Sequence, residues 1–180
     1  MALDCYNVIN SGYTQNCLSS VGGIYENEVY WASFDAVSGV TANTSNVVTG
    51  VTMSSGTFFW RVKQLKNAAA DEEGVNVNPE NGTLAYEQTM KFKLARRTTE
   101  SRNLVARGAP QKSSFIVKEK ATGVYWLIGD DIGLYIDKSS KGTSGQKIDD
   151  FNGWDMVFIG DSTFPAREIQ SSVVATITAG

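Results

Sequence analysis

Large apolar side chains alternate with charged ones in residues 86–94, which read Tyr-Glu-Gln-Thr-Met-Lys-Phe-Lys-Leu. In an extended chain Met90, Phe92 and Leu94 fall on one side, and Lys91 and Lys93 fall on the other. The pattern therefore predicts a strand with one buried and one solvated face. Because such a strand needs partner strands to satisfy its backbone, this feature constrains the fold more than any other in the chain.

Several other stretches carry a strand pattern. Residues 114–120 and 124–128 predict a hairpin closed by Ala121-Thr122-Gly123, and a second tight reversal at 129–133 leads into a short strand at 134–136. We expect these three strands to be adjacent and antiparallel. Strands are also predicted at 47–53, 58–63, 154–159 and 173–178, the last of them at a sheet edge.

One helix is predicted, at 98–107. Thr98 and Thr99 can supply a capping oxygen, and Glu100 places a negative charge in the first turn, where the helix dipole favours it. Gly108 is expected to end the helix in the left-handed conformation, and Pro110 prevents the helix from resuming. A helix this short needs to pack on the sheet to be stable.

These elements predict a mainly β fold, an antiparallel β-sandwich or partly open barrel flanked by one short α-helix. Three polar segments, 37–46, 66–83 and 139–146, are expected to be long loops. The sequence shows no internal repeat and no boundary, so residues 1–180 are interpreted as a single domain.

The residue types disfavour an enzyme. The chain contains no histidine, which is the commonest general base and zinc ligand, and it has no phosphate-binding or nucleophile motif. Carboxylates cluster at Asp130-Asp131 and at Asp149-Asp150, where Asp is typical of tight turns. We therefore predict no catalytic residue, no metal site and no cofactor. A hydrolase that uses the acidic clusters is left as an alternative.

The net charge of −3 rests on 16 basic and 19 acidic residues and does not favour a general nucleic-acid coat. It is unevenly distributed: −6 over 1–90, +7 over 91–120 and −4 over 121–180. The basic segment 91–120 has two interpretations, solvated element faces or a surface that meets an acidic surface on a neighbouring copy.

The position of the first basic residue and the length of the apolar runs bear on the cellular compartment. The first basic residue is Arg61 and the longest apolar run is 124–128, so we expect no secretory or transit leader, no membrane partner, and synthesis in a cytoplasm. Cys5 and Cys17 are expected to be buried thiols.

The tryptophans allow two interpretations. Trp60 and Trp126 lie in apolar strands and are predicted to be core residues, whereas Trp31 and Trp154 have polar flanks. Aromatic side chains on a flat surface can bind sugars, but filling a core or an interface is their commoner use.

The order of elements in 84–160 resembles that of tail-tube-like structural proteins of tailed bacteriophages. The strand at 84–94, the short helix, the 115–117 strand, Tyr125-Trp126-Leu127-Ile128-Gly129 and Asp150-x-Asn152-Gly153-Trp154 carry the likeness. Within that group the chain especially resembles forms from gut phages, including the ring proteins of crAss-like phages. Asn16-Cys17 and Val21-Gly22-Gly23-Ile24 also resemble that group.

The resemblance implies a non-enzymatic virion protein of the phage tail, assembled in the host cytoplasm. Copies would form a six-fold or twelve-fold ring, contact adjacent tail or neck rings, and let genomic DNA pass through an acidic lumen without sequence-specific binding. The helix would flank the sandwich at the subunit boundary, and 115–136 would lie in the main sheet. Candidate residues of the subunit interface are Arg96, Arg97, Arg102, Arg107, Asp149 and Asp150.

The resemblance also implies that the N-terminal arm (about 1–23) and the loops 37–46 and 66–83 contact other rings. The chain departs from the family in a long 66–83 insertion and in a C-terminal extension at about 161–180. Basic residues of 91–120 should face a neighbouring subunit and not the lumen. The alternative function is a β-sandwich receptor- or carbohydrate-binding module of a phage particle.

Overall fold

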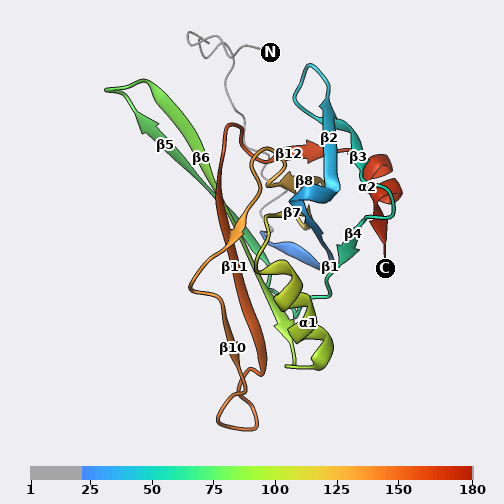
Figure 1. Cartoon of the computed structure of the whole chain (residues 1–180), viewed down its shortest axis with the longest axis vertical. Coiled ribbons are helices and arrows are strands. Elements are labelled where there is room, and N and C mark those ends of the chain that lie inside the picture. Colours follow the sequence, from blue (N-terminus) through green and yellow to red (C-terminus); the bar gives the residue numbers. More distant parts are fainter. Residues whose placement is uncertain (1–21, 180) are drawn as a thin grey trace.

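The alternating segment at 86–94 lies inside a thirteen-residue strand, β6 (Thr83–Ala95), in a computed structural model that describes residues 22–179. Met90 and Phe92 are fully buried, and Lys91 and Lys93 keep partial exposure, as the alternation predicts. β6 lies at the centre of a five-stranded sheet of order β10-β11-β6-β5, in which β9 pairs with β11 (Figure 1). The other strands of this sheet are β5 (Ala70–Asn78), β9 (Tyr135–Ile136), β10 (Lys141–Thr143) and β11 (Gly153–Ser162).

A second sheet of eight strands has the order β13-β4-β1-β7-β8-β12-β3-β2. It is antiparallel except where β12 pairs with β3 and β13 pairs with β4. The predicted hairpin forms β7 and β8 of this sheet, and Gly123 takes the left-handed conformation in its turn. The strands are β1 (Ile24–Ser33), β2 (Val37–Ala42), β3 (Val48–Met53), β4 (Phe59–Arg61), β7 (Ser113–Glu119), β8 (Tyr125–Ile128), β12 (Arg167–Ile169) and β13 (Thr178–Ala179).

Apolar side chains bury both faces of the eight-stranded sheet. Between the sheets, Trp31, Phe92, Phe115 and Phe158 pack with ring centroids 5.0–5.9 Å apart. On the other face, a second cluster that includes Ile116 lies in the curl of the sheet. Burial on both faces explains why Phe115-Ile116-Val117 is a continuous apolar run and not an alternating one. The predicted mainly β fold is therefore confirmed.

The predicted helix is α1 (Thr99–Gly108), and Thr98 caps it. The Thr98 hydroxyl accepts from the Ser101 amide at 3.2 Å, and the Ser101 hydroxyl accepts from the Thr98 amide at 3.0 Å. The prediction for Gly108 is wrong: it is the buried last residue of the helix, and a Cβ there would meet the Trp31 ring at 2.0 Å. Gly108 is thus required for close packing, because any side chain would collide with the indole.

The C-terminal region differs from the prediction of an edge strand at 173–178. Residues 171–177 form a second helix, α2 (Ser171–Ile177), and only Thr178–Ala179 is a strand. Val174 and Ile177, one turn apart, are the buried residues of α2 and pack in the curl of the eight-stranded sheet. The fold therefore has two α-helices where one was predicted, together with a single 3₁₀ turn at Phe34–Ala36 among the described residues.

Two segments expected to be loops are mostly strand. Segment 37–46 contains β2, which pairs with β3, and segment 66–83 contains β5, which pairs with β6 along its whole length. Segment 139–146 contains the short β10. The three strands predicted at 114–136 are not all adjacent, because β9 leaves the β7–β8 hairpin and joins β11 in the other sheet.

The prediction that Trp60 is a core residue is wrong. β4 buries Phe59 and leaves Trp60 exposed, whereas Trp31 is buried and donates from its indole nitrogen to the Ser113 hydroxyl at 2.8 Å. Trp126 and Trp154 are half-buried against the core between the sheets. Cys5 and Cys17 lie in 1–21, outside the described residues, and so does the N-terminal arm (about 1–23) except for its last two residues.

Candidate functional site

The most prominent surface feature is a hairpin that projects from the body of the molecule (Figure 1). Residues 74–87, here called the projecting hairpin, are the outer parts of β5 and β6 and the turn between them. Every residue of β5 is exposed, and its only strand partner among the described residues is β6. The part of β5 beyond Glu73 is five residues, or about 17 Å of extended chain.

One face of the projecting hairpin is apolar. Val75 lies opposite Tyr86, and Val77 lies opposite Leu84, so that the four side chains share one face. Val75 and Val77 are each 63% exposed and Leu84 is 48% exposed. On the same face nearer the body, Gln88 lies opposite Glu73 and buried Met90 lies opposite Asp71, so a polar pair separates this apolar face from the core.

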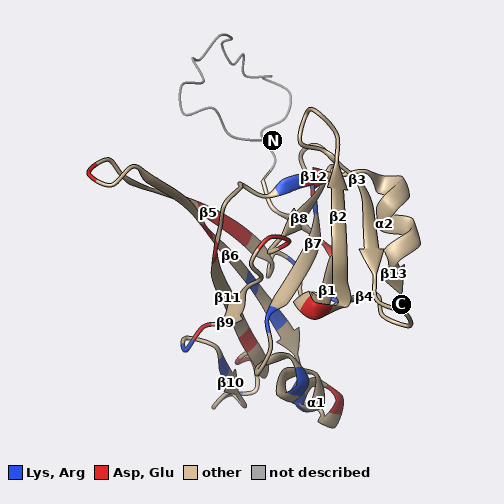
Figure 2. Cartoon of the chain, turned by 45° about the horizontal axis from the view of Figure 1, so that its top comes forward, with Lys and Arg blue, Asp and Glu red and all other residues tan. Residues whose placement is uncertain are grey.

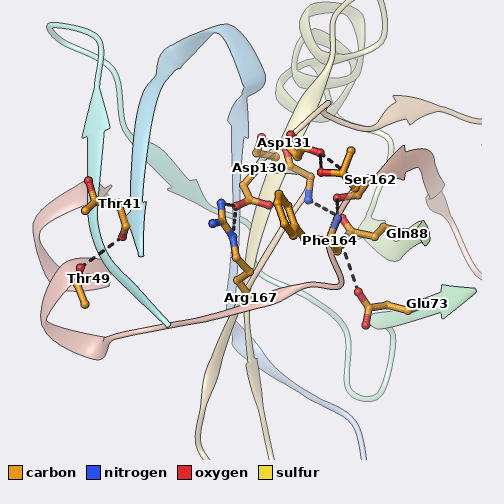
Figure 3. Close-up of polar contacts among 12 residues, drawn as sticks. Thr41, Thr49, Glu73, Gln88, Asp130, Asp131, Ser162, Phe164 and Arg167 are labelled. Carbon is orange, nitrogen blue, oxygen red and sulfur yellow. Dashed lines mark hydrogen bonds and ion pairs between the residues drawn. The ribbon is translucent and has the colours of Figure 1, made fainter. Parts of the chain in front are cut away.

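A buried polar contact marks the base of the projecting hairpin (Figure 3). The Gln88 side chain, fully buried, donates to the Phe164 carbonyl at 3.2 Å and accepts from the Gly129 amide at 2.9 Å. Glu73, opposite Gln88, accepts from the Ala166 amide. These bonds hold the base of the hairpin to two loops of the body, so its direction is fixed.

Asp130 and Asp131 have structural partners close by (Figure 3). Asp130 is almost fully buried and pairs with Arg167, whose Nε lies 2.8 Å from a carboxylate oxygen. Burial raises the pKa of Asp130, and the Arg167 guanidinium acts in the opposite direction. Asp131 accepts from the amide and the hydroxyl of Thr163 at 2.9 and 2.6 Å. Both carboxylates therefore tie the 129–133 reversal to residues 163–167, which are distant in sequence.

An acidic pocket of about 350 Å³ lies near the base of the projecting hairpin. Asp71, Glu73 and Glu119 line it together with Trp126. Asp71 is exposed as a whole residue, but burial of its carboxyl raises its pKa first, and the neighbouring carboxylates Glu73, Glu119 and Glu72 raise it further. In the part of the chain that the structure describes, no group of three potential ligands is arranged to hold a metal ion.

The candidate interface residues lie at the end of the molecule opposite the projecting hairpin. Arg102 and Arg107 are exposed on α1, and Arg96 and Arg97 precede it. The Arg96 amide donates to the Asn152 carbonyl at 2.7 Å, and Arg97 stacks over the Trp154 ring at 5.6 Å. These contacts bring the arginines to the same end as the loop that carries exposed Asp149 and Asp150 (Figure 1).

The two carboxylates of that loop differ in their contacts. Asp150 accepts from the amides of Gln146 and Lys147 at 2.7 and 2.8 Å, and these bonds lower its pKa. Asp150 therefore shapes the loop, whereas no hydrogen bond ties the Asp149 side chain to another described residue. The grouping of the six candidate residues at one end is consistent with an interface, which stays a prediction.

The basic segment 91–120 does not form one surface. Lys91 pairs with Glu72 at 2.7 Å, Lys93 with Asp155 at 3.7 Å, and Lys120 with Glu26 at 2.8 Å. The arginines at 96, 97, 102 and 107 form no ion pair with any described residue. Figure 2 marks basic residues on the α1 ribbon, and acidic residues along β5 and at the tip of the hairpin. The four arginines are therefore at the α1 end, while Lys112 and Lys118, which also form no ion pair with a described residue, lie over aromatic rings elsewhere.

An apolar groove of about 340 Å³ lies between β4 and α1. Phe58 and Trp60 line one wall, edge to face with centroids 6.3 Å apart, and Leu104 lines the other. Phe58 is 40% exposed, Trp60 56% and Leu104 37%. Arg61 and Arg107 also line the groove. Sequence reasoning missed it because Trp60 was placed in the core.

Neither helix of the described residues 22–179 is long and apolar enough to cross a membrane. No protein-family model matches the chain, and neither a curated protein nor a solved structure matches it.

Proposed function

We propose that this chain is a structural virion protein whose copies form a ring of a phage tail or neck, through which DNA passes. The projecting hairpin is the observation that carries the proposal. A two-stranded ribbon is marginally stable by itself, and an exposed strand edge invites pairing with another chain. A hairpin that projects from the body and exposes valine and leucine is explained when a second copy covers it.

The charge distribution supports assembly from identical copies. Residues 67–90 contain five acidic and no basic residues, and the arginines of 91–120 that lack ion pairs among the described residues lie at the opposite end. The acidic hairpin of one copy is attracted to the arginines at the α1 end of another, where Asp149 and Asp150 also lie, and this attraction favours head-to-tail contact between copies. The acidic balance of the whole chain suits a channel for DNA, because a like-charged wall does not retain a passing duplex.

Negative-stain electron microscopy of the purified full chain tests the proposal. Annular particles with a central hole, alone or stacked, are the expected result. Fluorescence anisotropy with a labelled duplex should detect little binding at physiological salt, because a conduit must not hold its cargo. Dispersed single copies at all concentrations would contradict the proposal.

The second candidate is a carbohydrate-binding module of a phage particle. The paired rings of Phe58 and Trp60 in the groove favour it, because an exposed aromatic surface can stack on a sugar. Glycan-array binding that is lost in the Trp60→Ala variant, in a protein that stays monomeric, would support this candidate over the ring.

A further inference from the structure

We infer that the apolar face of the projecting hairpin of one copy occupies the groove between β4 and α1 of a second copy. The inference rests on the proposed self-assembly and names its contact. The hairpin of each copy would then have a binding site, and the groove of each copy would have a ligand, both supplied by other copies.

The two surfaces match in chemistry. Val75, Val77 and Leu84 form a ridge of branched aliphatic side chains along one face of the hairpin. Phe58 and Trp60 present ring faces and edges, and Leu104 closes the opposite wall. Each surface exposes apolar area in the single copy, so contact would remove both areas from water at once.

The charges of the two surfaces favour contact of a hairpin with a groove over contact between two hairpins. The hairpin carries Glu80 at its turn and Glu87 on its polar face, and it contains no basic residue. Arg61 and Arg107 line the groove. An acidic ribbon is therefore attracted to the groove, whereas two hairpins laid against each other would place like charges together.

The positions of the two surfaces require two copies. The hairpin points away from the body, and α1 lies at the other end, in both views of the molecule (Figures 1 and 2), while the groove is lined by residues of the β4 region and α1. A chain cannot fill its own groove in this arrangement. Because the contact joins two different surfaces, an open series of copies keeps one free hairpin at one end and one free groove at the other, and both are filled only when the series closes into a ring.

Disulfide trapping tests the contact in the full chain, with Cys5 and Cys17 replaced by Ser. Val77→Cys and Leu104→Cys proteins are mixed under mild oxidation, and we expect a cross-linked dimer that contains one copy of each. Asn76→Cys replaces Val77→Cys in the matched control, because residue 76 lies on the opposite face of the same strand. If the proteins assemble but Val77→Cys and Asn76→Cys cross-link to Leu104→Cys equally, or neither cross-links, the inference is overturned and the ring proposal stays intact.

A charge placed on the ridge gives an independent readout. Val77→Lys should raise the protein concentration needed for assembly by about tenfold or more, because burying an ammonium in a groove lined by Arg61 and Arg107 is costly. Asn76→Lys adds the same charge next door, on the polar face, and should change assembly much less. Equal effects of the two variants would contradict the contact.

The remaining outcomes separate the two proposals. A monomeric parent protein would overturn the ring and the contact together. If the Trp60→Ala variant assembles as the parent does but loses a glycan binding that the parent shows, the groove receives a carbohydrate and not the hairpin.

Discussion

Gly108 lies against the indole of Trp31, which also bonds Ser113, so the ring cannot move away freely. Gly108→Ala should lower the free energy of unfolding by about 1–3 kcal/mol through overpacking. This cost exceeds the gain of up to about 1 kcal/mol that alanine brings to a helix. Thermal unfolding followed by circular dichroism measures the change. Gly39→Ala is the matched control, because a Cβ at residue 39 meets nothing within 4 Å.

The Asp71 carboxyl makes the stability of the fold depend on pH. Its pKa is raised in the folded chain above the ordinary aspartate value of 3.8, so the folded state holds the proton more tightly than the unfolded state. Stability therefore falls as pH rises from the unfolded pKa through the raised folded pKa, and the cost is complete above it.

Asp71→Asn removes this cost. The variant should unfold at a higher temperature than the parent at pH 7, and the advantage should shrink as the pH falls to about 3, where both states of the parent are protonated. Melting curves across that range make the comparison. A variant less stable than the parent at pH 7 would show that the carboxylate is favourably bonded.

Single residues also show where sequence reasoning reached its limit. Alternation placed Met90, Phe92 and Leu94 on the buried face, because a long strand repeats its signal many times. β4 has three residues, too few to show which face is buried, and Trp60 was assigned to the wrong one. The cap at Thr98 could be predicted because it depends on neighbours in sequence, whereas the contact of Gly108 depends on Trp31, which is distant in sequence.

At the scale of elements, the cap of α1 is expected to hold the arginine-bearing helix in place. Thr98→Ala removes the hydroxyl that accepts from the Ser101 amide and should cost about 1 kcal/mol. Hydrogen exchange should be faster at the amides of the first turn. Thr99→Ala serves as the control, because Thr99 is the first residue of the helix and not its cap. Equal losses in the two variants would mean that the cap is not what stabilises the turn.

The elements that were missed share a cause. β5 buries neither face, so a long apolar pattern is absent, although the run Val75-Asn76-Val77-Asn78 carries a short alternation that could have indicated it. α2 is rich in β-branched residues, which favour strands, and it is a helix because Val174 and Ile177 pack one turn apart in the curl of the sheet. Tertiary packing overrode local preference there.

At the scale of the whole molecule, attraction between the acidic hairpin and the arginines of the α1 end makes assembly sensitive to salt. Raising ionic strength from about 0.1 M to about 1 M shortens the screening length from about 10 Å to about 3 Å. Assembly should weaken but persist, because burial of the apolar ridge is not screened. Sedimentation velocity over a salt series checks this. Assembly that strengthens steadily with salt would show that charge opposes the contact.

The candidate site was only partly accessible to sequence reasoning at this scale. The uneven charge could be read directly, and it indicated contact between copies. Ion pairs formed on folding, such as Lys91 with Glu72 and Lys120 with Glu26, neutralise part of the basic segment, and they depend on which strands become neighbours. The groove and the ridge likewise exist only once β4 meets α1 and β5 pairs with β6.

Native mass spectrometry of the purified full chain tests self-assembly most directly. The account predicts one closed species, of six or twelve copies of the 19.5 kDa chain, whose copy number stays fixed as concentration increases. A single 19.5 kDa species at every concentration would contradict it.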